Sequence, residues 1–336
     1  MKGEELMRAT DALDALVREG EAGEAEREEL ARRLDRLARV EHGMTFRYIP
    51  GGRFTMGCDD GEADEAPAHS VELRRFWMAD APLSWARFCT LAGWSAPPEG
   101  LPTGEVERDT SFRIHDTNKI RLQYCEDQTL RARDWHSHAP KHDWVGGGQN
   151  VSSHELFGEP ERAEGPIGYD TKPMVALFLP DLEEMMARHQ ASSAPLALPS
   201  EAQWERAARG LHVGQPYPWG ADDGEASSHC DCGSWGEFKL LPSRRFPPND
   251  YGLHGTCGGT WEACADHYDA QAYADEAREH PVTVPTDEPH HVLRGGSFTD
   301  EPWACRVSFR SSVQLSGEYP PCSPNIGVRL VLRERD

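Results

Sequence analysis

The sequence has no long hydrophobic run and comparatively little positive charge. No apolar stretch approaches the roughly 18–20 residues that a bilayer-spanning helix needs, and the amino terminus has no hydrophobic secretion signal. Lys and Arg number 35 against 57 Asp and Glu, so the formal net charge is -22. A surface this acidic repels nucleic-acid phosphate and anionic lipid. We therefore expect a cytoplasmic protein with neither nucleic acid nor a membrane as its partner.

The sequence also lacks an even number of closely spaced cysteines. Its nine cysteines are scattered along 336 residues, which favours reduced thiols over a disulfide framework. The only close spacings are Cys230-x-Cys232 and the pair Cys257 and Cys264. Proline and glycine are plentiful, with 25 and 31 residues, and predict a loop-rich fold. The length allows one large domain with an appendage.

Residues 1–43 predict a helical hairpin that precedes a main domain of residues 44–336. The two apolar stripes are Leu6, Leu13, Leu16 and Val17, and Leu30, Leu34, Leu37 and Ala38. Helices this short are marginal alone, so another surface must cover their leucines. The hairpin either packs on the main domain, which we favour, or recruits another chain.

Local signals in the main domain predict a clear helix over residues 200–209. Ser200 can cap its amino end, with Gln203 reaching back to the cap, and Gly210 ends it. Trp204 and Ala207 mark its buried face. A second helix is predicted over residues 182–189, and short strands flank the turn at residues 50–52.

Three histidines, His136, His138 and His142, lie within seven residues of a poorly patterned segment. Such a cluster is compatible with a metal site. A loop without a rigid scaffold rarely makes three imidazoles converge, so we favour histidines that are exposed or individually hydrogen-bonded.

Seven segments occur in an order that resembles one family, the formylglycine-generating enzymes or sulfatase-modifying factors. They are Ile49–Gly57, Ala197–Gly210, Tyr217–Gly220, Asn249–Leu253, Gly258–Glu262, Leu293–Phe298 and Asn325–Val331. The resemblance covers roughly residues 44–333. It implies an α+β, C-type-lectin-like fold that is rich in loops, with short strands and few helices.

The resemblance also implies where catalytic copper would bind. The family's oxidase holds copper with two cysteines, three and eight residues after the serine of Gly-Gly-Ser. Counting from Ser297, these positions are Asp300 and Cys305 here. Because Cu(I) prefers soft thiolates, one carboxylate and one thiolate make a poor site unless another thiol, such as Cys322, joins Cys305.

A calcium ligand of the family is missing as well. The asparagine of its Gly-Asn-x-Trp-Glu-Trp motif corresponds to Gly259, which has no side-chain oxygen, although backbone carbonyls could still hold a structural calcium ion. Cys230 and Cys232 lie near the family's other calcium ligands. They could bind zinc or a soft metal with Cys257 or Cys264, but the absence of a firm second pair favours free buried thiols.

We favour a non-catalytic module that binds a protein or peptide without a cofactor. Its binding residues would lie in the closing loop, residues 298–323, which resembles the variable segments of proteins that retroelements diversify on this fold. The candidate ligand-binding residues are Phe298, Thr299, Asp300, Trp303, Phe309, Ser312, Val313, Leu315, Tyr319 and Ser323. Aromatic side chains among small polar ones suit recognition, although some of these aromatics are expected in the core.

The alternative is a copper-dependent oxidase that converts a peptidyl cysteine to formylglycine or performs a related oxidation. Cys305 would carry the chemistry as a copper ligand, with Asp300 or Cys322 as its co-ligand. The pocket residues would be Ser297, Trp261, Arg306 and Arg310. A plainer interpretation of Cys305 is a small side chain packed in the core, since cysteine is among the most buried residue types.

Overall fold

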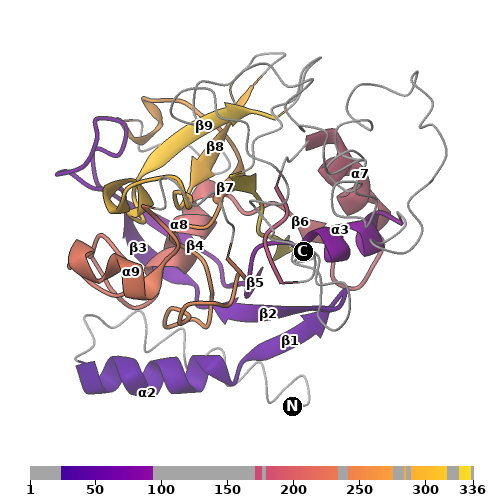
Figure 1. Ribbon diagram of the computed structural model, residues 1–336, viewed down its shortest axis with the longest axis horizontal. Helices are drawn as coiled ribbons and strands as arrows, with labels where there is room; N and C mark the ends of the chain where they lie inside the picture. Colours follow the sequence, from indigo (N-terminus) through magenta and orange to yellow (C-terminus); the bar gives the residue numbers. More distant parts are fainter. Residues whose placement is uncertain are drawn as a thin grey trace, which may run out of the picture.

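Three β-sheets carry the architecture in the computed structural model, which describes residues 24–93, 171–175, 179–233, 241–274, 284, 289–315 and 325–333 (Figure 1). The largest sheet has five antiparallel strands in the order β1, β2, β5, β11 and β6. Their bounds are Ala38–Glu41, Met44–Ile49, Phe76–Ala79, Val331–Leu332 and Leu196–Ala197. The strand β11 near the end of the chain thus lies inside a sheet that begins near its start.

The second sheet bears the closing loop. Its order is β10 (Ile326–Gly327), β7 (Trp261–His267), β8 (His290–Arg294) and β9 (Arg310–Gln314). β10 runs parallel to β7, and the other pairs are antiparallel. A third sheet pairs β3 (Gly52–Met56) with β4 (His69–Leu73). Pro50 and Gly51 of the predicted turn lie between β2 and β3, and Gly52 is the first residue of β3.

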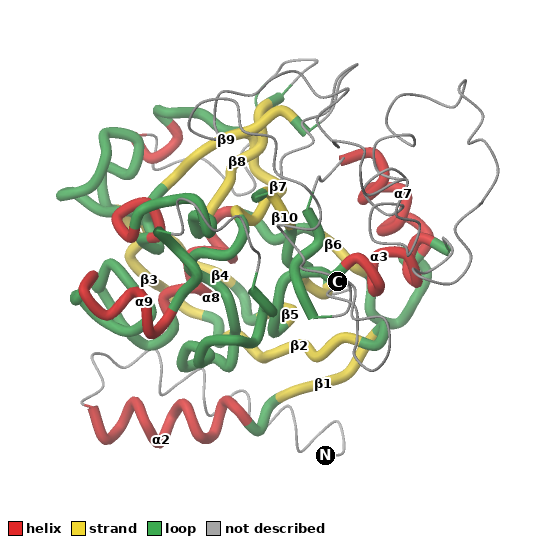
Figure 2. Tube along the Cα trace, viewed as in Figure 1, coloured by secondary structure: helices red, strands yellow, loops and turns green. Residues whose placement is uncertain are grey.

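The helices are short. They are α2 (Glu24–Asp35), α3 (Trp85–Ala92), α7 (Leu179–Arg188), α8 (Glu201–Arg209) and α9 (Ala226–His229). Figure 2 shows α2, α3 and α7 outside the sheets and α8 among them. Single 3-10 turns are η2 (Asp223–Glu225), η3 (Ala272–Ala274) and η4 (Pro302–Cys305). None of the helices in the described ranges is long and apolar enough to cross a bilayer. The α+β, loop-rich class predicted from the sequence is confirmed.

The α8 helix forms as its local sequence predicts. Gln203 N donates to Ser200 Oγ at 3.1 Å, and Ser200 N donates to Gln203 Oε1 at 2.9 Å, which completes the capping box. Trp204 and Ala207 are buried. Gly210 ends the helix at a φ of 63°, in the left-handed region that glycine adopts readily.

The amino-terminal region is only partly described. The first predicted helix lies outside the described residues, whereas α2 buries Leu30 and Leu34 against the main core and Leu37 follows it. Ala38, assigned to the same helical stripe by the sequence, instead begins strand β1. Strand β1 pairs with β2 of the main sheet, although residues 38–41 precede the domain boundary predicted at residue 43.

A buried ion pair connects the two larger sheets. Arg329, between β10 and β11, donates from Nε to Glu262 Oε2 at 2.9 Å and from Nη2 to Glu262 Oε1 at 2.7 Å. Its Nη1 also donates to the carbonyl of Ala79 in β5 at 3.1 Å. The indole of Trp204 donates to the same carboxylate at 2.7 Å. Glu262 on β7 is therefore fully partnered and fixes α8 and both sheets relative to one another.

Candidate functional site

The closing loop begins at the end of β8 with a turn that only glycines fit. Gly295 and Gly296 have φ values of 96° and 69°. A Cβ on Gly296 would lie 2.6 Å from Cys305 Sγ and 2.9 Å from the carbonyl oxygen of Ala304. The turn thus packs directly against η4, so Gly296 sets the depth at which the Cys305 thiol is buried.

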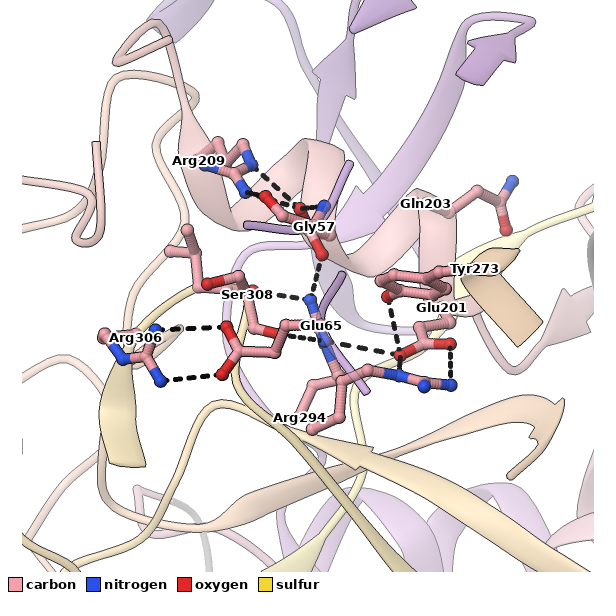
Figure 3. Close-up of polar contacts among 12 residues, drawn as sticks. Gly57, Glu65, Glu201, Gln203, Arg209, Tyr273, Arg294, Arg306 and Ser308 are labelled. Atoms are coloured by element: carbon pink, nitrogen blue, oxygen red, sulfur yellow. Dashed lines mark hydrogen bonds and ion pairs between the residues drawn. The ribbon is translucent and has the colours of Figure 1, made fainter. Parts of the chain in front are cut away.

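Beneath this turn, Arg294 connects α8 to the far end of the loop (Figure 3). Its guanidinium pairs with the carboxylates of Glu201 and Glu205. It also donates to the carbonyl of Ser308 at 2.8 Å and to that of Val307 at 2.6 Å. Since all three charged side chains are fully buried, every one of these contacts is made away from water.

The carboxylate of Glu205 is held ionised by its neighbours. Burial alone would raise its pKa, but the guanidinium groups of Arg209 and Arg294 outweigh burial, and the pKa lies below its usual value. Arg209 donates to Glu205 Oε1 at 2.6 Å and to the carbonyl of Gly57 at 3.0 Å. The network therefore reaches from the closing loop to the turn after β3.

Both arginines predicted as pocket residues belong to this scaffold. Arg310 donates to both oxygens of Glu201, at 2.7 and 3.1 Å, and its guanidinium lies 4.3 Å from the centre of the Tyr273 ring. Arg306 donates to both oxygens of the buried Glu65 at 3.1 and 2.7 Å, as Figure 3 shows. Each arginine is already neutralised by a carboxylate of this chain, so neither is a free cation for a substrate.

Asp300 stands where the family's oxidase has its first copper-ligating cysteine, and its carboxylate faces inward. Asp300 Oδ2 accepts from the backbone N–H of Ser297 at 2.9 Å and from the Ser297 hydroxyl. Asn325 Nδ2 in turn donates to Ser297 Oγ at 3.1 Å. Burial raises the pKa of Asp300, although the bonds from Ser297 and the indole of Trp261 oppose that rise. Its carboxylate is thus engaged in holding the turn.

Two further thiols lie in another segment near this loop. Cys230 and Cys232 follow α9, and their Sγ atoms lie 3.3 Å apart. Cys305 is buried in the same cluster as Cys230, and Cys232 packs against this cluster. Cys232 is the most accessible of the three. Cys257 and Cys264, which the sequence suggested as partners of the Cys-x-Cys pair, pack in the same buried cluster as Cys230 and Cys305. Burial and the neighbouring Cys230 and Cys232 raise the pKa of the Cys257 thiol.

The three thiols share their protons unequally. Hydrogen bonds from Cys230 and then from Cys305 lower the pKa of Cys232. Hydrogen bonds with Cys230 and Cys232, together with burial, raise the pKa of Cys305 well above its usual value. The pKa of the partly accessible Cys232 is therefore shifted in the opposite direction from that of the buried Cys305.

Backbone hydrogen bonds and glycines hold the Cys-x-Cys segment in place. Gly233 N donates to the carbonyl of Asp300 at 2.7 Å, and Gly259 N donates to that of Asp231 at 2.7 Å. Gly258 N donates to the carbonyl of Gly295 at 2.8 Å. A Cβ on Gly258 would lie 2.2 Å from Asp231 O, so the close approach requires glycine.

An aromatic group lies on the same loop. Trp303 contacts Phe309 edge-on with ring centres 5.3 Å apart, and Phe309 lies 6.0 Å from Trp261. Trp261 is buried, Phe309 is partly buried, and Trp303 is 55% exposed. The guanidinium of Arg306 lies 5.7 Å from the centre of the Phe309 ring.

The predicted ligand-binding residues fall into three groups. Phe298, Thr299 and Leu315 are buried in the core and do not present their side chains to a ligand, which corrects the prediction for these three. Asp300, Phe309, Ser312 and Val313 are partly accessible, and Trp303 is exposed. Tyr319, Ser323, Cys322 and the three clustered histidines lie outside the described residues. The loop also contains more regular structure than its pattern predicted, namely η4 and β9.

The donor chemistry allows a test of the metals that the resemblance implies. Asp300 and Cys305 alone do not suit Cu(I), because the carboxylate is a hard ligand and is held by Ser297. Cys305 with a thiol of the Cys-x-Cys pair does suit it, since both donors are sulfur. For calcium, Gly259 offers no side-chain oxygen. Within the described ranges, no group of three or more His, Cys, Asp and Glu side chains is arranged to hold a metal ion.

Known proteins resemble this chain over most of its length. The formylglycine-generating enzyme of Streptomyces coelicolor is 29% identical over 305 residues, which cover 84% of this chain and 87% of that enzyme. The inactive C-alpha-formylglycine-generating enzyme 2 of Bos taurus is 26% identical over 323 residues, covering 88% and 90% of the two chains. Sequence similarity therefore includes both catalytic and inactive relatives.

Solved structures share the fold at lower sequence identity. PvdO from Pseudomonas aeruginosa superimposes with a TM-score of 0.57 at 19% identity, covering 88% of this chain and 98% of PvdO. Treponema denticola variable protein 1 superimposes with a TM-score of 0.51 at 16% identity, covering 87% and 95%. The family described as the sulfatase-modifying factor enzyme 1-like domain matches residues 38–334. This chain therefore belongs to the sulfatase-modifying factor family, which includes the formylglycine-generating enzymes.

Proposed function

We propose that this chain is a recognition protein that binds a protein or peptide partner through the surface around Trp303. This recognition surface consists of Trp303, Phe309 and the aliphatic part of Arg306. The observation that carries the proposal is an exposed tryptophan on a turn that is fixed by its neighbours. A large aromatic side chain left in water on a rigid support is typical of an interaction hot spot.

The support of Trp303 comes from its own backbone and its neighbours. Arg306 Nε donates to the Trp303 carbonyl at 2.9 Å while its other nitrogens bind Glu65. Tyr217 donates its hydroxyl to the carbonyl of Pro302 at 3.1 Å. Because the turn is already ordered, binding a partner costs little conformational entropy at this position.

The residues around the surface favour recognition over catalysis by the closing loop alone. Asp300 occupies the position of a required thiolate and is engaged with Ser297. Arg306 and Arg310 are paired with carboxylates of this chain. The likeness to an inactive relative and to a variable protein fits a family in which the fold also serves non-catalytic members.

Selection of binders from a displayed random-peptide library tests this proposal. Immobilised full chain is the target, and each selected peptide is measured against Trp303→Ala and Val40→Ala. Val40 is a matched control because it is also a large exposed apolar residue, 71% exposed, but lies on β1 in the other large sheet. We expect Trp303→Ala to weaken binding by about 30-fold, the effect of a hot spot worth about 2 kcal/mol. Val40→Ala should leave the affinity unchanged.

Equal affinities for the two variants would contradict the proposal. So would a set of selected peptides that all bind outside the closing loop, as mapped by cross-linking. A folded Trp303→Ala variant is verified by its unchanged urea midpoint before any affinity is interpreted.

A second candidate, a copper-dependent oxidase, is favoured by one observation, the two sulfurs beside Cys305. Bound Cu(I) would activate dioxygen, the oxidant of the reaction. In that case Cys305 and Cys232 would hold the metal, and Trp303 and Phe309 would orient the substrate peptide. Oxygen uptake by the copper-loaded chain with a cysteine-containing peptide tests this candidate, and an uptake that is the same without the peptide counts against it.

A further inference from the structure

We propose that a polar cavity between β2, β5 and α3 is a binding site for inorganic phosphate. The cavity has a volume of about 150 Å³, and its lining includes Thr45, Asp80, Ser84, Arg87, Ser243 and Arg244. A single water needs only about 10–15 Å³ of such space, so the cavity can accept a polyatomic ion. None of its described lining residues belongs to the recognition surface around Trp303, and the inference is therefore independent of the proposed function.

The guanidinium of Arg87 is the first argument for an anion. The turn between β1 and β2 lies beside α3 (Figure 1), and a Cβ on Gly43 in this turn would lie 2.2 Å from Arg87 Nη1. The chain has 57 Asp and Glu, yet no carboxylate in the described ranges forms an ion pair with this guanidinium. Arg294, Arg306 and Arg310, by contrast, are each paired with a buried glutamate. Arg87 thus keeps its positive charge for an external anion.

Hydroxyl groups around Arg87 supply further donors. Ser84 Oγ accepts from Arg87 N at 3.3 Å as the N-cap of α3, which leaves the hydroxyl proton of Ser84 available to donate. Thr45, Thr171 and Ser243 also line the cavity, and their hydroxyls form no hydrogen bond within the described part of the chain. Hydrogen bonds to an ionised acceptor are roughly twice as strong as neutral ones. A tetrahedral oxyanion therefore finds several donors in addition to the guanidinium.

A carboxylate in the lining favours phosphate over other oxyanions. Asp80 is buried after β5, and its Oδ1 accepts from Arg244 Nη2 at 2.5 Å. Arg244 therefore offsets the charge of Asp80, and Arg87 makes the sum of the three charges positive. Asp80 Oδ2 accepts no hydrogen bond from the residues that the structure describes. Inorganic phosphate retains a proton at neutral pH and can donate it to this oxygen, whereas sulfate and acetate have none to donate and are repelled by the carboxylate.

Backbone hydrogen bonds hold the segments around the cavity in place. Asp80 N donates to the carbonyl of Thr45 at 2.9 Å, which fixes the end of β5 against β2. Ser243 N donates to the carbonyl of Thr171 at 2.8 Å. The donors thus come from distant parts of the sequence but are positioned before any ligand arrives. Pre-organised donors lose little conformational entropy on binding.

Equilibrium dialysis of the full chain with radiolabelled phosphate tests the site. The dialysis is run near neutral pH at constant ionic strength, and unlabelled anions compete. We expect one phosphate per chain, with weaker competition by sulfate and acetate. O-phosphoserine distinguishes the free ion from a phosphorylated side chain. It should also compete more weakly, because the second pKa of a phosphate ester, about 6, leaves it mostly without a proton.

The test variant is Arg87→Met, which removes the free cation of the cavity. It should weaken phosphate binding by more than about 10-fold, since hydrogen bonds to charged groups are among the stronger ones. The control is Arg53→Met, which makes the same substitution and the same change of charge on β3. Arg53 forms an exposed ion pair with Glu72 there, so this variant should bind phosphate like the unaltered chain.

Chemical modification of the unaltered chain gives a second readout, because Arg87→Met also removes a side chain that packs against Gly43. Phenylglyoxal modifies accessible guanidinium groups, and mass spectrometry locates the modified residues. Phosphate should protect Arg87 and leave the exposed Arg53 reactive. This readout does not depend on the folding of any variant.

Several outcomes would overturn the inference. They are a failure of the chain to retain radiolabelled phosphate, equal affinities of Arg87→Met and Arg53→Met, and equal protection of the two arginines. Competition by sulfate or O-phosphoserine as strong as that by phosphate would also overturn it. Peptide binding that depends on Trp303 would survive each of these outcomes, so the recognition proposal and the phosphate site fail separately.

Discussion

The two sides of the closing loop differ in how many of their polar side chains are paired with other residues of the chain. On the side facing α8, Arg294 and Arg310 are paired in the interior with Glu201 and Glu205. On the other side, the thiols of Cys230 and Cys232 contact each other, and the side chain of Trp303 is exposed. The first side therefore has the properties of a scaffold, and the second carries the exposed residue of the proposed recognition surface. In this fold, paired buried charges hold the loop in place.

The largest expected effect is the loss of the scaffold charge. Arg294→Met leaves Glu201 and Glu205 buried with one fewer cation, and uncompensated buried charge typically costs about 3–5 kcal/mol of unfolding free energy. Urea unfolding followed by circular dichroism measures this cost. A surface ion pair serves as control: Arg53→Met, which removes the pair with Glu72, should change stability by less than about 1 kcal/mol. If Arg294→Met and Arg53→Met lower the free energy of unfolding equally, the buried ion pairs do not stabilise the fold more than a surface ion pair does.

The next largest effect is a difference in stability between alanine substitutions at two adjacent glycines, Gly258 and Gly259. Gly258 and Gly259 have similar positive φ values of 69° and 73°. A Cβ on Gly258 meets Asp231 O at 2.2 Å, whereas one on Gly259 meets nothing within 4 Å. We expect Gly259→Ala to cost about 1 kcal/mol for the left-handed backbone and Gly258→Ala roughly 2 kcal/mol more for the displaced Cys-x-Cys segment.

Thermal and urea unfolding of both glycine variants provide the measurement. If the two variants have the same stability, the close approach of residues 231 and 258 is not tight in solution.

A smaller effect concerns pH on the scaffold side. Burial lowers the pKa of His291 on β8, and the neighbouring His267 adds to this, while the bond to the Cys264 carbonyl opposes it. The folded chain thus binds a proton here less readily than the unfolded chain. Stability from this residue is complete above the unfolded pKa of about 6.5 and declines as the pH falls below it.

Urea unfolding between pH 7.5 and pH 5.5 checks this prediction. His291→Gln should flatten the decline, because glutamine does not titrate and retains an amide that can bond to the Cys264 carbonyl. An unchanged slope in the variant would show that other groups, such as His254 with its similarly lowered pKa, account for the pH dependence.

The smallest effect is expected for the exposed tryptophan. Trp303→Ala should change the free energy of unfolding by less than about 0.5 kcal/mol, because surface substitutions away from special features rarely do more. Phe309→Ala, which removes the ring beneath it, should cost about 1–2 kcal/mol. A large loss of stability in Trp303→Ala would place this residue with the scaffold instead of the recognition surface.

The comparison also explains which predictions from sequence succeeded. The capping box of α8 and the burial of Trp204 depend on residues within one helical turn, so the local pattern was sufficient. The family resemblance predicted the α+β fold, and the family match confirmed it. Leu315 was misjudged as accessible because an aliphatic side chain in an irregular loop has no periodicity that separates surface from core. Phe298 is one of the loop aromatics for which burial in the core was the alternative expectation, and it is buried.

By itself the sequence determined the family, the local caps and glycine turns, and the presence of Asp300 where the family's oxidase has a thiolate. These features depend only on residue identity and on short spacings along the chain, and both can be read directly from the sequence. Only the tertiary structure decided that Cys230 and Cys232 meet Cys305, and that Arg306 and Arg310 are neutralised by Glu65 and Glu201. Contacts between residues so distant in the chain are fixed by how the sheets pack, because each thiol or charge has several possible partners until the backbone frame selects one.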